Sequence, residues 1–153
     1  MRISIVALIL SWGFASTAEA QQFASPIDLV ETLYSSYFSG LVIDDFAPYL
    51  SDRLTAQMDG KVSASEFEVL GFDPIVGDAD WEPRNFKAEL LEQGEHAAQA
   101  KVGFISHNVQ ISVTLTLILE PLHGWQINHI AGISGNKTWC TNDIIALKPL
   151  PAG

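Results

Sequence analysis

Cysteine and basic residues are scarce in this chain, and each scarcity excludes a class of protein. A single cysteine among 153 residues excludes an internal disulfide framework and a zinc site built from several cysteines. Lysine and arginine number only 8, against 18 aspartates and glutamates, and the formal net charge is -10. Nucleic acids and anionic lipid surfaces attract basic proteins, so this composition argues against binding to either.

Long apolar runs are also few, and the clearest one lies at the amino terminus. Arg2 is followed by an almost wholly apolar stretch from Ile3 to Ala15 and then by Ala18-Glu19-Ala20. A basic start, a short apolar stretch and a small-x-small site are typical of a cleavable signal peptide. The stretch is too short to span a hydrocarbon core of about 30 Å as a helix. We therefore expect residues 1–20 to be removed by cleavage after Ala20, which predicts a periplasmic or secreted protein without stable membrane insertion.

The rest of the chain has the composition of one folded domain. Apolar residues make up 48% and charged residues 17%, which is too apolar and too weakly charged for a disordered chain. The length also fits one domain. We expect a single α+β domain over residues 21–148 and a short tail over residues 149–153.

Apolar residues at helical spacing predict three helices in the first half of this domain. The first helix is expected over residues 25–40, with Ser25 as its N-cap and Pro26 at its first position. The second is expected over residues 44–58. A third and shorter helix is expected over residues 63–70, after the break at Asp59-Gly60.

From Asn85 onward the apolar period changes from 3.6 to 2, which predicts four antiparallel strands with turns at residues 93–95, 107–108 and 121–124. The stretch from Val109 to Leu119 is the clearest, because apolar residues alternate with Ser112, Thr114 and Thr116. This polar stripe fits either a solvent-facing side of the sheet or the interface of a homodimer. The segment after Gly135 is expected to add a fifth strand or to pack across the sheet. Helices followed by an antiparallel meander indicate an α+β fold with three N-terminal helices on a curved four- to five-stranded sheet.

The order of these elements and several short motifs resemble a known family. The motifs are Leu70-Gly71-Phe72-Asp73-Pro74-Ile75, Asp80-Trp81, Asn85-Phe86-Lys87 and the final Gly124-Trp125-Gln126-Ile127. Together they resemble an exported bacterial family catalogued as domain of unknown function 3828, within the nuclear transport factor two-like superfamily. The resemblance implies a cone-shaped α+β fold. Some enzymes of this superfamily, such as ketosteroid isomerases and scytalone dehydratases, place aspartate and histidine in the cavity of the cone. This chain departs from the family at Asn128-His129, where acidic residues are frequent.

An acidic loop is the first candidate for a binding site. It contains Asp73, Asp78, Asp80, Trp81 and Glu82. An aromatic ring among carboxylates suits recognition of a cation or a polar partner. Clustered carboxylates also suit Ca²⁺ or an acid/base pair, whereas the structural alternative is that the aspartates cap turns between Gly and Pro residues.

His129 is the candidate for catalysis, together with Asp73. Strict alternation places His129 on the same face as Trp125 and Ile127. If that face lined a pocket, the imidazole would suit proton transfer with a carboxylate. The structural alternative is a histidine at the rim of the sheet.

Other residues that bind metals or act as nucleophiles lack the required spacing. The stretch from Asp59 to Phe67 copies the second half of an EF-hand loop, but Thr55 stands where the first carboxylate ligand is needed. The histidines show no spacing typical of zinc sites. Cys140 has no nucleophile signature, which favours a buried thiol or one that pairs between chains. We expect no metal site and no cofactor.

These observations favour an exported, acidic, non-catalytic domain that binds a small ligand or a protein partner in the periplasm or cell envelope. One alternative is a small pocket enzyme that performs proton transfer or dehydration with His129 and a carboxylate. Another is an immunity or inhibitor protein whose negative charge steers it to a basic exported partner.

Overall fold

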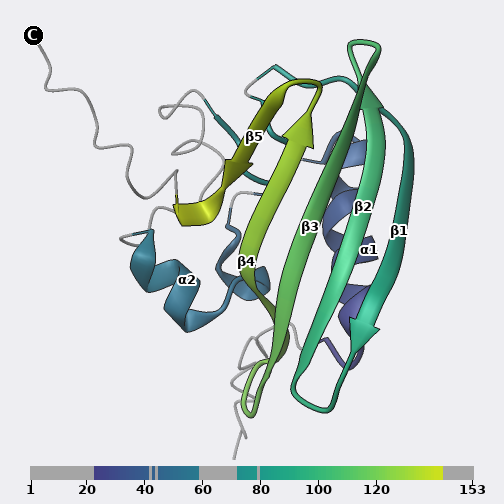
Figure 1. Cartoon of the computed structure of the whole chain (residues 1–153). Coiled ribbons are helices and arrows are strands. Elements are labelled where there is room, and N and C mark those ends of the chain that lie inside the picture. The colour runs from purple at the N-terminus through teal and green to yellow at the C-terminus, as the bar shows by residue number, and fades with distance from the viewer. Residues whose placement is uncertain (1–22, 42, 44, 59–71, 79, 143–153) are drawn as a thin grey trace, which may run out of the picture.

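The computed structural model describes residues 23–41, 43, 45–58, 72–78 and 80–142. Within these ranges the fold is α+β, with two short helical segments after the first helix and a five-stranded antiparallel sheet in the order β1-β2-β3-β4-β5 (Figure 1). The elements are α1 (Pro26–Phe38), the 3-10 helix η1 (Ala47–Tyr49), α2 (Asp52–Gln57), β1 (Pro83–Gln93), β2 (Ala97–Ser106), β3 (Val109–Glu120), β4 (Gly124–Ser134) and β5 (Lys137–Cys140). Among the described residues, no helix is long and apolar enough to cross a membrane.

The first predicted helix is confirmed. Pro26 begins α1, and Ser25 precedes it in an extended conformation, although its side chain makes no capping hydrogen bond. Gly40 follows the helix with a φ of 71°, a left-handed conformation that favours glycine and ends helices. The third predicted helix, over residues 63–70, lies outside the described residues.

The second predicted helix is wrong as a continuous element, because the chain breaks at Leu50. Leu50 is extended and forms a parallel bridge with Ile127 of β4. The next amide, that of Ser51, donates a hydrogen bond of 2.9 Å to the Ile127 carbonyl. Ser51 then caps α2, since its Oγ accepts the Leu54 amide at 3.1 Å. Hydrogen bonds to the sheet edge therefore replace those of a continuous helix.

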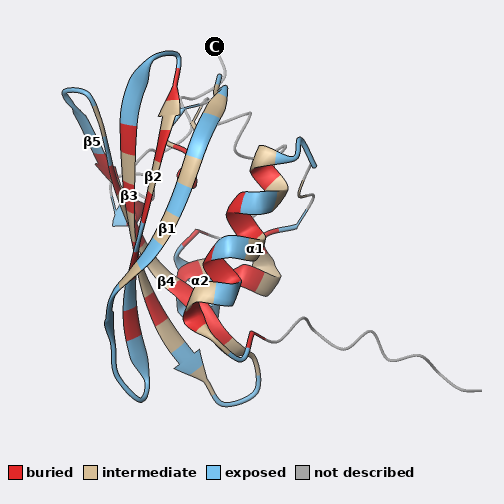
Figure 2. Cartoon of the chain, turned by 90° about the vertical axis from the view of Figure 1, so that its right-hand side faces the viewer, coloured by how far each residue is buried: buried red, intermediate tan, exposed pale blue. Residues whose placement is uncertain are grey.

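The strands and turns agree with the alternation of apolar residues. The four predicted strands are present, and β5 confirms the alternative in which the later segment adds a fifth. Figure 2 shows α1 on one face of the sheet, where the buried residues gather. On β3 the buried face consists of Ile111, Val113, Leu115 and Leu117. Tyr34 of α1 stacks on Phe86 of β1 with ring centroids 5.9 Å apart, which ties the helix to the sheet.

A bulge in β4 changes which residues face the core. Thr116 of β3 pairs with His129, but the next residue, Leu117, pairs with Ile127, so Asn128 has no partner opposite it. Residues directly opposite each other share a face of the sheet. His129 therefore lies with Thr116 on the face away from α1, while Ile127 and Ile130 are both buried in the core. The expectation that His129 shares a face with Trp125 and Ile127 is wrong, because strict alternation does not continue through a bulge.

Candidate functional site

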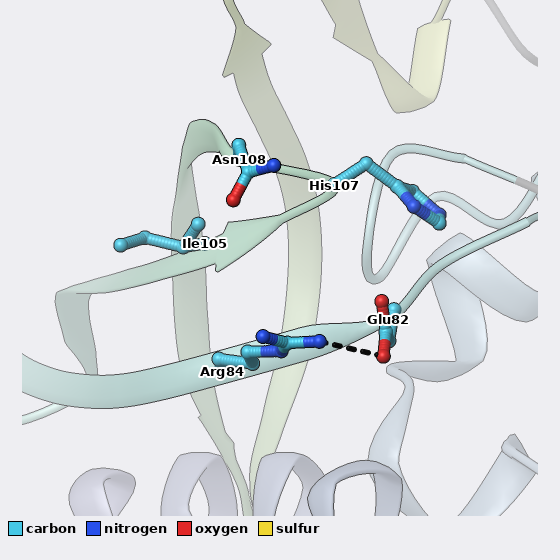
Figure 3. Close-up of a pocket in the computed structure, with 5 residues that line it drawn as sticks. All are labelled: Glu82, Arg84, Ile105, His107 and Asn108. Atoms are coloured by element: carbon cyan, nitrogen blue, oxygen red, sulfur yellow. Dashed lines mark hydrogen bonds and ion pairs between the residues drawn. The ribbon is translucent and has the colours of Figure 1, made fainter.

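A shallow polar pocket lies at the end of the sheet where the loop before β1 meets the turn between β2 and β3. Its volume is about 210 Å³, and its lining residues are Glu82, Arg84, Ile105, His107 and Asn108. Figure 3 shows Glu82 just before β1, Arg84 at the start of β1, and the other three side chains at the end of β2 and in its turn. The pocket thus joins two segments that are more than twenty residues apart in the chain.

Pairing of the strands brings these residues together. Arg84 lies opposite Ile105, and the Glu82 amide donates a hydrogen bond of 2.9 Å to Oγ of Ser106, a side chain that is almost fully buried. In an extended segment, residues two apart point to the same side, so Glu82 and Arg84 project together. The local fold therefore fixes both charged residues at the pocket.

The backbone at this end of the sheet is unusual. His107 and Asn108 form the two-residue turn with φ values of 47° and 64°, and Asn85 in the adjacent bulge of β1 has a φ of 58°. These are the non-glycine residues with positive φ in the described part of the chain. A two-residue turn of this kind needs a positive φ at both positions, which non-glycine residues adopt uncommonly and asparagine, aspartate and histidine adopt most often. Strained residues of this kind tend to cluster at functional sites.

The pocket holds opposite charges in contact. Nη2 of Arg84 donates to Oε1 of Glu82 at 2.8 Å, and both side chains are more than half exposed to solvent. The hydrogen bond from Arg84, together with its positive charge, lowers the pKa of the Glu82 carboxyl below its ordinary value. The Glu82 carboxyl is therefore ionised at neutral pH and faces the guanidinium of Arg84.

His107 links the turn to the loop before β1. Its Nε2 lies 3.2 Å from the carbonyl oxygen of Asp80 and 3.9 Å from the Asp80 Oδ1. A carbonyl oxygen only accepts hydrogen bonds, so Nε2 carries the hydrogen in this contact. The Asp80 side chain itself is 96% exposed. The imidazole thus holds the loop by its backbone and leaves the Asp80 carboxylate in solvent.

The predicted acidic loop does not form one surface. Asp78, Asp80 and Glu82 are exposed, but Asp73 and Trp81 pack toward α1. The Trp81 ring lies 5.0 Å from the Tyr37 ring of α1, measured between centroids. One oxygen of Asp78 accepts the Asp80 amide at 3.3 Å, which closes a turn. The structure therefore brings Glu82 into the pocket, places Asp78 and Asp80 beside it along the chain, and separates Asp73 and Trp81 from it.

The Asp73 carboxylate is held by hydrogen bonds that stabilise the local fold. Tyr37 donates its hydroxyl to Oδ2 of Asp73 at 2.7 Å, and the Ile75 amide donates to Oδ1 at 2.8 Å. Burial raises the pKa of the Asp73 carboxyl to about 6, while these hydrogen bonds act in the opposite direction. The Gly77 amide also donates to the Asp73 carbonyl at 2.7 Å. Asp73 thus closes the turn over residues 73–77 and fastens it to α1, as the capping alternative expects.

His129 and Asp73 are not brought together. Nδ1 of His129 lies 2.7 Å from Oγ1 of Thr141, just beyond β5. Asp73 contacts α1 on the core side of the sheet, whereas His129 projects from the opposite face. No hydrogen bond or ion pair joins the two residues within the described ranges. The arrangement needed for proton transfer between them is therefore missing.

The described residues offer no alternative metal centre. No group of three or more His, Cys, Asp or Glu side chains in the described part of the chain is placed to hold a metal ion. The EF-hand-like stretch over residues 59–67 lies outside the described residues. Cys140 is half-buried at the end of β5.

Sequence analysis missed most of the pocket, since only Glu82 was among its candidates. The available signals were the charged pair Glu82-x-Arg84 and the polar turn His107-Asn108. They become one site only when the register between β1 and β2 is known. No family model matches the chain, and neither a curated protein nor a solved structure matches it.

Proposed function

We propose that the chain is an exported, non-catalytic binding domain whose recognition surface is the pocket at Glu82, Arg84 and Asn108. The observation that carries the proposal is the pocket itself, which gathers an exposed ion pair, an amide and an apolar wall on strained backbone. The rival enzyme needs an acid and a base within reach of one substrate. Its two candidate residues project from opposite faces of the sheet, so the binding function is better supported.

Export is supported by the pattern of residues 1–20 and by the place of Phe23. Phe23 is buried against Tyr49, and its carbonyl accepts the Trp125 amide at 3.0 Å. Cleavage after Ala20 would leave a new amino terminus only a few residues before this anchor. Mass spectrometry of the protein secreted from a bacterial host tests this proposal, because the product should begin at Gln21.

We also propose that the fold is of the cone-like type that the family resemblance implies. Its support is the order of the elements, with α1 before a long antiparallel meander and on one face of it. A bulge increases the twist and bend of a strand. The bulge at Asn128 in β4 is consistent with a sheet that curves around the helix.

A panel of small polar compounds tests the binding function. The panel should include anions, cations, zwitterions and neutral polyols, with the melting temperature of the protein as the readout. A ligand at ten times its Kd adds about 1.4 kcal/mol to the free energy of unfolding. For a domain of this size, that gain raises the melting temperature by about 4 °C.

The variant R84Q should abolish the stabilisation by any compound that binds the pocket. K101Q is the matched control, because it removes one positive charge from an exposed position on the neighbouring strand. Compounds that stabilise R84Q and the unmodified protein equally would contradict the proposed site. Loss of their effect in D73N or H129Q, with R84Q unaffected, would favour the enzyme instead.

A further inference from the structure

We infer that the ligand of this pocket is a small zwitterion that carries a carboxylate and an ammonium group, such as an α-amino acid. The inference rests on the proposed function and names the chemical class of the ligand. It follows from the charges that line the pocket, from the ease with which their ion pair can open, and from the size of the space.

The charges of the pocket favour a ligand with both signs. A simple anion at Arg84 would also face the Glu82 carboxylate, which lies 2.8 Å from the guanidinium. It would further be repelled by a chain with a formal net charge of -10. A simple cation at Glu82 would face Arg84 in the same way. A zwitterion pairs with both groups and carries no net charge into the field of the protein.

The existing ion pair is easily exchanged. Both of its side chains are well exposed, at 66% for Arg84 and 60% for Glu82, and one contact joins them. Ion pairs of this kind contribute little to stability, because water solvates the separated charges well. A ligand can therefore separate Glu82 from Arg84 and form an ion pair with each of them.

The remaining groups suit a small organic ligand. The guanidinium has five N–H donors in a planar fork, so it can bind both oxygens of a carboxylate. The Asn108 amide provides a further donor and acceptor, and Ile105 provides an aliphatic wall next to Arg84 (Figure 3). A volume of about 210 Å³ is below the range of about 300–1,000 Å³ that drug-sized ligands occupy. The pocket is thus sized for a molecule of a few heavy atoms.

The neighbouring contacts keep the pocket in place while the ion pair opens. The Glu82 amide is held by Ser106, and the loop before it is held by the contact between His107 and the Asp80 carbonyl. Neither contact uses the Glu82 carboxylate or the Arg84 guanidinium. Movement of the two charged side chains therefore does not require movement of the backbone.

An NMR titration at constant ionic strength tests the inference with three probes: L-alanine, acetate and methylammonium. We expect L-alanine to shift the backbone amides of Glu82, Arg84 and residues 105–108, with acetate and methylammonium at least about tenfold weaker. R84Q and E82Q should each weaken L-alanine binding by at least about tenfold. K101Q and E92Q, which make the same charge changes at exposed positions outside this pocket, should bind L-alanine as the unmodified protein does.

The outcomes separate the inference from the proposed function. If acetate binds as tightly as L-alanine, or if E82Q binds L-alanine normally, the zwitterion is the wrong class. If L-alanine fails but another compound of the panel shifts the same amides, the ligand class is also wrong and the binding function stands. If no compound shifts these amides, both the inference and the proposed site are overturned.

Discussion

At the scale of single residues, Asp73 is the carboxylate that burial affects most clearly. Its folded-state pKa is about 6, compared with an ordinary value of 3.8, because burial disfavours the ionised form more than the hydrogen bonds from Tyr37 and the turn amides favour it. The folded protein therefore binds this proton more tightly than the unfolded chain does. The resulting stability is fully present below pH 4 and is lost as the pH rises through about 6.

The variant D73N tests the direction of this pH dependence of stability. Since asparagine cannot ionise, the free energy of unfolding of the unmodified protein should fall relative to that of D73N between pH 4 and pH 7. The difference between the two pKa values corresponds to about 3 kcal/mol as an upper limit. Urea denaturation at a series of pH values measures the free energy of unfolding of both proteins, with D78N as the control for an exposed aspartate. Parallel profiles for the unmodified protein and D73N would show that Asp73 is not the responsible group.

Contacts between distant residues explain why the sequence predicts only some of the residues of the candidate site. The charges of the acidic loop are visible in the sequence, and Glu82 is indeed at the pocket. Which aspartates point inward depends on α1, because Tyr37 lies 36 positions away from the Asp73 that it binds. Contacts of such long range leave no local pattern in the sequence.

At the scale of elements, local periodicity predicts the strands well and the connections between elements poorly. Alternation and turn residues identify β1 to β4, since each is set by neighbouring residues. The break at Leu50 and the bulge at Asn128 come from pairing with distant partners. Periodicity alone therefore predicts a continuous helix through Leu50 and assigns His129 to the wrong face of the sheet. The polar pocket has the same origin, because it depends on the register between β1 and β2.

The contact between β4 and β5 provides a prediction at this scale. Trp139 of β5 packs directly over Gly132 of β4, and its indole Nε1 donates to the Pro74 carbonyl at 3.1 Å. A methyl group at position 132 would overlap the indole ring. We expect G132A to lower the free energy of unfolding by about 1–3 kcal/mol, as overpacking does, and to loosen the turn over residues 73–77.

G103A is the matched control for this substitution. Gly103 is also in the sheet, but a methyl group there would meet only Nε2 of Gln110, at 3.7 Å. The substitution should therefore be neutral or slightly stabilising, because alanine reduces the freedom of the unfolded chain. Equal losses of stability in G132A and G103A, measured by urea denaturation, would mean that the Trp139 contact is not the cause.

At the scale of the whole molecule, the two faces of the sheet have different roles. One face is filled by the core against α1, and the other carries the polar stripe of Ser112, Thr114 and Thr116. Charged residues of the neighbouring strands, Lys87, Glu89 and Lys101, share this second face by their pairing. That composition suits a solvent-exposed face, and the homodimer through the sheet stays a prediction.

The central claim is that recognition takes place at the end of the sheet formed by β1, β2 and the turn at His107-Asn108. A crystal structure of the protein with the most strongly stabilising compound of the panel tests it most directly. The account predicts that the compound contacts Arg84 and at least one of Glu82 and Asn108. A compound found instead between α1 and the sheet, or beside His129, would contradict it.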